Sequence, residues 1–135
     1  KSLLPGEKGE NENLDFKDLN KRELGKLGEN LAVEYLQREG LKVIVRNYRC
    51  PKGEMDIIAW DGDCLVFVEV RSRTSSYRGT AEESVVFSKL KRLKAIAIYY
   101  LMEQNIKPWP ILRFDMVAIN FSDQEPQINW LRNIG

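Results

Sequence analysis

Two segments of the chain repeat apolar residues at helical spacing. In the first, residues 20–40, the apolar stripe stops before Gly40, and glycine commonly follows the end of a helix. In the second, residues 88–105, apolar residues again recur every three or four positions. The two stripes consist of Leu24, Leu27, Leu31 and Tyr35, and of Leu90, Leu93, Ala97, Tyr100 and Leu101. Both segments are therefore predicted to be helices.

Strand-forming residues dominate most of the remaining chain. Strands are predicted over residues 41–49, in two runs between 53 and 73, over 111–121 and, as a short final strand, over 126–130. The predicted order is α-β-β-β-α-β, with the last strand added, which is typical of an α/β domain. Residues 1–19 are polar and aperiodic and are predicted to form a flexible N-terminal arm, which leaves residues 20–135 as a single domain.

A hairpin is predicted within residues 53–73. The pair Asp61-Gly62 is a strong signal for a two-residue turn between antiparallel strands. With these two residues at the centre of the turn, Glu54 lies opposite Glu69, and Asp56 lies diagonally from Glu69 on the same face. The register therefore predicts three carboxylates close together on a face that is otherwise apolar.

Carboxylates that face one another across strands destabilise a sheet unless a cation compensates them. Mg²⁺ suits such a place, because it binds one or two carboxylates together with waters and phosphate oxygens. Alternatively, Arg71 and Lys52 neutralise the acids in a surface network. The spacing alone leaves both interpretations open.

The composition limits the available chemistry. A chain of 135 residues suffices for one domain whose core needs no metal or disulfide. The absence of histidine and the presence of only two cysteines exclude a Cys/His zinc site and a Ser-His or Cys-His triad. Any acid–base or metal chemistry must then come from carboxylates, lysine, tyrosine, arginine or water.

Charge and hydropathy indicate a location and a class of partner. No segment has the apolar length of a membrane span and no secretory signal is recognisable, so a cytoplasmic protein without membrane contact is expected. Residues 42–52 carry four basic and no acidic side chains, and residues 71–94 carry seven basic and two acidic ones. Such segments indicate either solvated faces or a surface that binds a polyanion.

The segment GEMDIIAWDGDCLVFVEVRSR, residues 53–73, resembles the YraN family of small bacterial proteins. The resemblance extends from about Gly25 to Phe121 and includes LGKLGENLAVEYL, KLKRLKAIAIYYL and RFDMVAI in this order. The family is similar to archaeal Holliday-junction resolvases of the PD-(D/E)xK superfamily. The resemblance implies a restriction-endonuclease-like core, with a mixed central sheet flanked by helices, and an endonuclease that hydrolyses DNA with Mg²⁺ or Mn²⁺.

The family's motif also implies roles for five residues. It implies metal ligands at Glu29, Asp56, Glu69 and the backbone carbonyl of Val70, and it puts Arg71 at the position of the motif lysine. Arginine stays charged and cannot be a general base, but it can bind a phosphate and stabilise transition-state charge. The predicted catalytic side chains are thus Glu29, Asp56, Glu69 and Arg71.

The expected partner is nucleic acid, most naturally DNA. Basic residues after the hairpin and on the second helix are predicted to follow its backbone, which gives affinity without sequence preference. These residues are Arg73, Lys89, Lys91, Arg92 and Lys94. A homodimer is a further expectation from the resemblance, because resolvase-like proteins of this fold are often dimers.

Two other interpretations remain open from the sequence. Arg71 in place of the motif lysine fits a nuclease fold whose site has degraded and which binds nucleic acid without cleaving it. The chain also fits an interaction protein that uses its N-terminal arm. A comparison of DNA binding with DNA cleavage would separate these three hypotheses.

Overall fold

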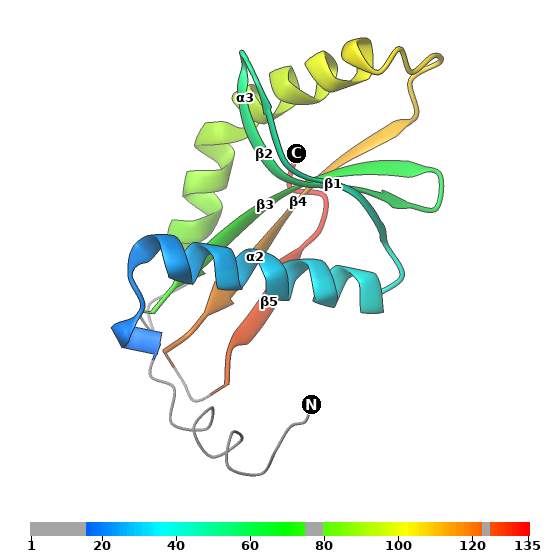
Figure 1. Ribbon diagram of the computed structural model, residues 1–135. Coiled ribbons are helices and arrows are strands. Elements are labelled where there is room, and N and C mark those ends of the chain that lie inside the picture. The colour runs from blue at the N-terminus through cyan, green and yellow to red at the C-terminus, as the bar shows by residue number, and fades with distance from the viewer. Residues whose placement is uncertain (1–15, 75–79, 123–124) are drawn as a thin grey trace.

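The protein folds into a five-stranded sheet with one long helix on each face (Figure 1). The computed structural model describes residues 16–74, 80–122 and 125–135, without the side chains of Lys17 and of residues 80–88. In chain order, the elements are the 3-10 turn η1 (Phe16–Asp18), α2 (Lys21–Arg38), β1 (Lys42–Cys50), β2 (Gly53–Asp61), β3 (Cys64–Arg73), α3 (Thr80–Glu103), β4 (Ile111–Asn120) and β5 (Gln127–Leu131). The predicted mixed α/β class is confirmed.

Helix α2 begins and ends at residues suited to those positions. The Asn20 side chain accepts a hydrogen bond from the Glu23 backbone N–H (2.7 Å), and the Glu23 carboxylate accepts one from the Asn20 N–H (3.0 Å). This reciprocal capping box satisfies backbone donors that have no partner inside the helix. Beyond the last turn, Gly40 has a φ of 100°, which only glycine adopts easily. The predicted end of the helix is therefore confirmed.

The strands lie side by side in the order β1-β2-β3-β4-β5. Neighbouring strands are antiparallel except β3 and β4, which run parallel over their full length from Cys64 paired with Ile111 to Arg73 paired with Asn120. Helix α3 connects these two parallel strands, as a crossover between parallel strands requires. The sheet is therefore mixed, and its central strand β3 holds the predicted motif.

Each face of the sheet packs on one helix. Residues of α2 and of one sheet face form a core that includes Ala32, Leu36, Ile57, Ala59, Val66, Val68, Val117 and Ile119. Residues of α3 and of the other face form a second core that includes Met55, Ile58, Leu65, Phe67, Leu93, Ile96, Ala97 and Leu101. The predicted strand alternation thus separates two apolar layers, which fix α2 and α3 against the strands between them.

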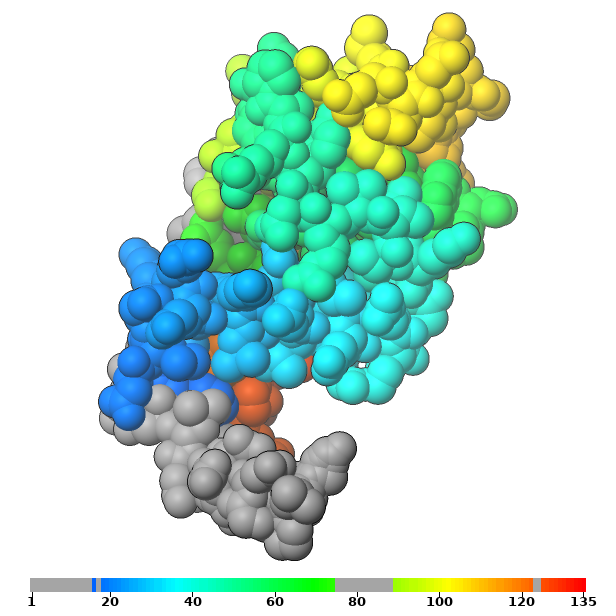
Figure 2. All heavy atoms as spheres, in the orientation of Figure 1, coloured from blue at the N-terminus to red at the C-terminus, as the bar shows by residue number. Residues whose placement is uncertain are grey.

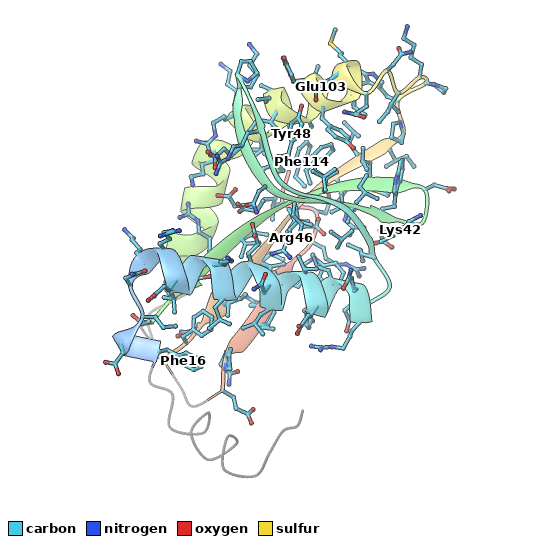
Figure 3. The ribbon with its side chains drawn as sticks, in the orientation of Figure 1. Phe16, Lys42, Arg46, Tyr48, Glu103 and Phe114 are labelled. Atoms are coloured by element: carbon cyan, nitrogen blue, oxygen red, sulfur yellow. The ribbon has the colours of Figure 1, made fainter. Side chains whose placement is uncertain are left out.

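The end of the predicted N-terminal arm packs against the body of the protein. The Phe16 ring lies 4.9 Å from the Phe121 ring, centroid to centroid, and Leu19 contacts the core beneath α2. Residues 1–15 lie outside the described residues. On the opposite side, the Tyr48 hydroxyl donates to the Glu103 carboxylate (2.7 Å), which ties β1 to the end of α3 (Figure 3).

The predicted register of the hairpin is wrong by one residue at the turn. Asp61 pairs with Cys64, so Gly62 and Asp63 form the turn in place of Asp61 and Gly62. Gly62 has a φ of 62° and takes the first central position, where a type II′ turn needs glycine. Each residue of β2 therefore faces a residue of β3 two positions later than predicted, for example Ile58 faces Phe67 instead of Leu65. A shift by two keeps every side chain on its predicted face. It brings Asp56 nearer to Glu69 along the strands.

Strand β2 separates from β3 near the predicted site. It pairs with β1 along its whole length but with β3 only from Ile57 to Asp61. From Gly53 to Asp56, the strand therefore continues in a two-stranded ribbon with β1, which leaves the sheet (Figure 1). We call the point where β2 leaves β3 the fork.

Neither of the long helices has the length and apolar character to cross a membrane, as far as the described residues extend.

Candidate active site

Asp56 is the first residue of β2 beyond the fork. Its Oδ2 accepts a hydrogen bond from the backbone N–H of Val70 on β3 (2.7 Å). The carboxylate therefore lies beside the β3 backbone, in the position that a strand partner would occupy. In a strand, the N–H and the carbonyl of one residue point to the same neighbouring strand, so strand geometry also directs the Val70 carbonyl toward this side.

Glu69 lies next to Val70 and approaches the fork from the face covered by α3. It is 8% exposed, and its Oε2 is 3.2 Å from the Lys89 Nζ. A buried carboxylate needs a compensating charge, and Lys89 supplies it. Lys89, which the sequence assigned to nucleic-acid binding, thus lies against a predicted metal ligand.

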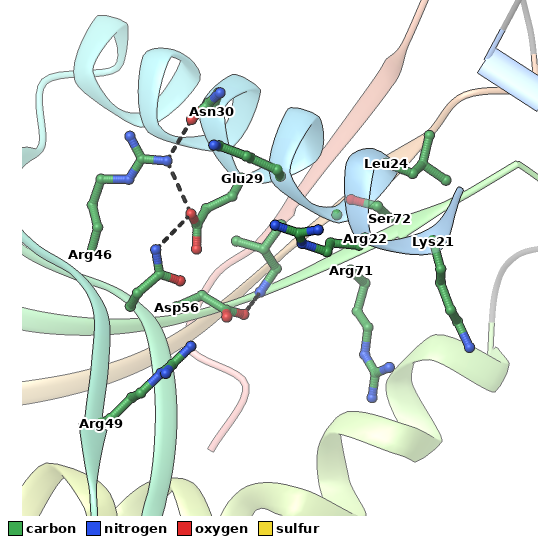
Figure 4. A pocket seen from close by; sticks show the side chains of 14 residues that line it. Lys21, Arg22, Leu24, Glu29, Asn30, Arg46, Arg49, Asp56, Arg71 and Ser72 are labelled. Carbon is green, nitrogen blue, oxygen red and sulfur yellow. Dashed lines mark hydrogen bonds and ion pairs between the residues drawn. The ribbon is translucent and has the colours of Figure 1, made fainter. Parts of the chain in front are cut away.

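Glu29 approaches the fork from the other face, on α2. Its Oε1 accepts hydrogen bonds from Arg46 (3.0 Å) and from the Asn47 side-chain amide (3.1 Å), both on β1 (Figure 4). Asn47 has a φ of 56°, a backbone conformation that asparagine tolerates better than most residues. The acid is only 9% exposed, so this contact joins the first helix to the β1–β2 ribbon within the protein.

The three acids influence one another. Burial raises the pKa of Asp56 to about 6, and repulsion from Glu69 and Glu29 acts in the same direction. The Val70 N–H and the charge of Lys89 oppose this rise without cancelling it. Among the described residues, Glu29 pairs with Arg46 and Glu69 with Lys89, whereas the Asp56 carboxylate makes no ion pair and accepts the Val70 N–H.

Arg71 is positioned between the two helices rather than on an open surface. It follows Glu69 by two residues on β3, and its side chain extends toward α3 (Figure 4). Its Nε is buried and has no hydrogen-bond partner in the described residues. A buried guanidinium donor without a partner is unusual in a folded protein and suits an anionic acceptor that the protein itself does not supply.

The donor set fits a hard divalent cation only in part. Two carboxylates and a backbone carbonyl are the oxygen ligands that Mg²⁺ and Mn²⁺ prefer, with water completing the coordination. Among the described residues, however, no three Asp, Glu, Cys or His side chains are gathered so that they could hold a metal ion by themselves. Asp56, Glu69 and the Val70 carbonyl can serve as direct ligands, whereas Glu29 is held by Arg46 and Asn47.

A pocket of about 800 Å³ opens beside the fork. Its walls come from the first half of α2, the middle of β1 and the last part of β3, and Glu29, Asp56 and Val70 lie within it (Figure 4). Figure 2 shows this face of the molecule, with the α2 atoms in blue to cyan next to the turquoise and green atoms of β1 and β2. The candidate site is thus accessible from the α2 side of the sheet.

The other basic residues predicted to bind nucleic acid do not line this pocket. On α3, the side chains of Lys91, Arg92 and Lys94 are exposed. The side-chain stem of Arg92 lies against Gly53, the first residue of β2. A Cβ built on Gly53 would be 3.5 Å from the Arg92 Cδ. Arg73 is half-buried at the end of β3.

Sequence reasoning did not assign Arg46 and Asn47 to the site. The one signal was the run of basic residues in 42–52, which shows a charge surplus but not which of its residues turns toward the first helix. Arg46 is labelled in Figure 3, where its side chain lies between the ribbon and α2. Contacts of this kind depend on how α2 packs across the strands.

A second buried charge network lies away from the fork. Asp115 is fully buried and accepts hydrogen bonds from Arg113, from the Trp130 indole and from the Asn133 backbone. Arg113 also pairs with Asp61 (2.8 Å). The donors to Asp115 among the described residues come from β4, from β5 and from Asn133 after it, so we interpret this network as structural.

Comparison with known proteins identifies relatives over most of the chain. Residues 28–119 match the model of the uncharacterised protein family UPF0102. A UPF0102 protein of Desulfitobacterium hafniense (strain Y51) is 51% identical over 114 residues, covering 82% of this chain and 94% of the relative. A UPF0102 protein of Herminiimonas arsenicoxydans is 46% identical over 110 residues, covering 82% and 84% of the two chains. The matched region contains Glu29, Asp56, Glu69 and Arg71.

Proposed function

Since the chain belongs to family UPF0102, the YraN family predicted from its sequence, and that name describes no activity, we propose from the site itself that the protein is a metal-dependent nuclease that hydrolyses phosphodiester bonds in DNA. The observation that carries this proposal is the position of Asp56. Its carboxylate lies at the fork against the Val70 backbone and near Glu69, at a pocket with basic walls, and burial raises its pKa to about 6. The resemblance to resolvases and restriction-endonuclease-like enzymes supports the same function by analogy of fold.

In this mechanism, Asp56, Glu69 and the Val70 carbonyl would hold Mg²⁺ or Mn²⁺. The bound cation supplies polarisation of the phosphate and a water of lowered pKa. Glu29 would remain hydrogen-bonded to Arg46 and Asn47 and would add negative charge beside the site without being a direct ligand. The protein's own part is to present oxygen ligands of fixed direction, two of which are anchored on the central strand.

Two cationic side chains serve the reacting phosphate. The unpartnered Nε of Arg71 gives a donor for a phosphate oxygen, which accounts for an arginine at the position of the motif lysine. Lys89 extends from α3 and places its ammonium group next to Glu69. The positive charges of Arg71 and Lys89 would stabilise the negative charge that develops during hydrolysis.

A cleavage assay tests this proposal. The purified protein is incubated with branched, flapped, single-stranded and linear DNA in Mg²⁺, in Mn²⁺ or with a chelator. We expect cleavage of at least one substrate that requires the metal and disappears in Asp56→Asn and Glu69→Gln, while DNA binding in chelator persists in both. Asp63→Asn is the matched control, since Asp63 is an exposed acid in the hairpin turn. Cleavage that survives in Asp56→Asn would show a contaminating nuclease or another site.

A second function is favoured by a specific observation. Asp56, Glu69 and Glu29 each have a donor within the protein, and the motif lysine is an arginine. These features suit a nuclease fold that binds nucleic acid without cleaving it. DNA binding of wild type without cleavage on any substrate in either metal would support this second function and refute the first.

A further inference from the structure

The pocket beside the fork has an unusual balance of charge. Of its fourteen lining residues, six are cationic and two are acidic. The acids are Glu29 and Asp56, which belong to the site already described. The cations come from three elements: Lys21, Arg22 and Lys26 from α2, Arg46 and Arg49 from β1, and Arg71 from β3. The two acids thus share the pocket with basic side chains from three different elements.

Most of these cationic side chains are not neutralised by an acidic partner among the described residues. Within the described part of the chain, Lys21, Arg22 and Lys26 make no ion pair. Arg49 pairs with Glu54 at 3.6 Å, but the two side chains are 76% and 68% exposed, and such pairs contribute little. Only Arg46 is committed, because it holds Glu29.

The pocket walls suit an extended anion better than a small apolar ligand. Leu24 and Val70 are the only large apolar side chains among the lining residues, whereas sites for small organic molecules are mostly apolar. Gly25 lines the pocket, and a Cβ built on it would meet no atom within 4 Å. The helix backbone is therefore open at this point, with Arg22 and Lys26 one turn apart beside it.

We propose that this pocket is the groove through which the nucleic-acid backbone enters, with the start of α2 and the β1 arginines as its phosphate-binding wall. The residues predicted to follow the nucleic-acid backbone were Arg73 at the end of β3 and four basic residues of α3, none of which lines this pocket. The inference rests on the proposed function, since Asp56 and Val70, which would hold the metal together with Glu69, line this groove. The ligand is recognised as a chain of phosphates, so binding should depend on salt and not on base sequence.

The test measures binding without cleavage. Affinity of the full chain for labelled duplex DNA of two unrelated sequences is measured by fluorescence anisotropy in chelator, over a range of salt concentrations. Arg22→Gln with Lys26→Gln removes two pocket cations. The control, Arg38→Gln with Lys107→Gln, removes two exposed cations outside the pocket. Each lost phosphate contact should reduce the slope of log K against log salt by about 0.9, hence by about 1.8 for the pocket pair.

A second variant narrows the groove without touching a charge. Gly25→Gln should weaken DNA binding, because the side chain would extend into open pocket space, whereas Gly25→Ala should bind like wild type. An unchanged affinity and slope in Arg22→Gln with Lys26→Gln, or an equal loss in the control pair, would overturn the inference.

The two proposals fail in different ways. If wild type binds DNA through the pocket but does not cleave it, the groove stands and the nuclease proposal falls. If wild type cleaves while the pocket variants bind and cleave as well as wild type, the nuclease proposal stands and the groove falls. If wild type does not bind DNA at low salt, both are refuted.

Discussion

Gly28 of α2 faces Ser72 of β3 so closely that a Cβ built on Gly28 would clash with the Ser72 Oγ and would lie 3.1 Å from the Ser72 Cβ. The absence of a side chain at Gly28 therefore sets the distance between the first helix and the central strand. Glu29 follows Gly28 directly, so the same close approach brings this acid to the fork. A glycine without chemistry of its own thus positions a predicted catalytic residue.

Substitution of this glycine should separate the helix from the strand. We expect Gly28→Ala to lower the free energy of unfolding, because overpacking in a well-packed interface typically costs about 1–3 kcal/mol. Gly25→Ala is the matched control, three residues earlier in the same helix with open space around it, and should raise stability by up to about 1 kcal/mol. Urea unfolding measures both. Equal effects of the two substitutions would contradict the role given to the Gly28 contact.

The raised pKa of Asp56 predicts a dependence of stability on pH. Its pKa is about 6 in the folded protein against 3.8 ordinarily, so folding disfavours the charged carboxylate. The folded state should therefore lose stability as the pH rises from about 4 to about 6, and the loss should persist above that range. Asp56→Asn lacks this charge and should be more stable than wild type at pH 8 but not at pH 3.5.

Chemical unfolding at the two pH values, without divalent metal, measures this difference. Asp63→Asn serves as the control for the loss of one carboxylate, since Asp63 is exposed. A stabilisation by Asp56→Asn that is the same at both pH values would mean that burial does not disfavour the charge of Asp56.

Arg71 should act through its charge and its donors. On the nuclease hypothesis, Arg71→Lys should retain or raise cleavage, because it keeps the charge and restores the motif residue. Arg71→Ala should reduce cleavage about 10²–10³-fold, the usual cost of one lost transition-state donor. Single-turnover cleavage rates at saturating DNA measure this effect apart from binding. If Arg71→Ala cleaves as fast as wild type, Arg71 has no catalytic role.

Lys89 should matter for cleavage more than for affinity. Lys89→Met removes the ammonium beside Glu69 but keeps a long apolar stem, so we expect slower cleavage with a small change in DNA affinity. Lys91→Met, an exposed lysine on the same helix, should instead weaken binding and leave the rate at saturating DNA unchanged. If the two variants behave alike, Lys89 is one more phosphate contact.

Asp115 should be required for folding and not for chemistry. Asp115→Ala leaves the Trp130 indole without its acceptor and the Arg113 guanidinium with Asp61 alone, and removal of one partner of a buried ion pair typically costs about 3–5 kcal/mol. Arg132→Ala, which removes an exposed partner of Asp61, should cost much less. Thermal unfolding measures both, and the cleavage rate per folded molecule should not change in either variant.

The sequence predicted those parts of the fold that depend on local pattern. The stripes from Leu24 to Tyr35 and from Leu90 to Leu101 were sufficient for the two helices, and runs of strand-forming residues for the strands, because period and composition are local properties. The turn was misplaced because Gly62 can take either central position of a two-residue turn, depending on whether the turn is type I′ or II′.

The site could be predicted only in part for a different reason. Asp56 and Glu69 lie on neighbouring strands, so their proximity follows from the hairpin. Arg46 meets Glu29 because α2 crosses the ribbon, and Lys89 meets Glu69 because α3 covers the opposite face. Such contacts depend on how elements distant in sequence pack together. A local pattern along the chain does not predict that packing.

The fork has a consequence for how the sheet and the site share the backbone. A strand inside a sheet normally has all its N–H and carbonyl groups engaged by its two neighbours, and an open edge invites a foreign strand to add on. On β3, the Asp56 side chain occupies the edge that β2 vacates. If β2 paired with β3 for two more residues, β2 backbone groups would bond the β3 edge. The Asp56 carboxylate would then lose its place against the Val70 backbone. On the nuclease proposal, the incomplete pairing of β2 with β3 is therefore what leaves the Val70 backbone available to a bound metal.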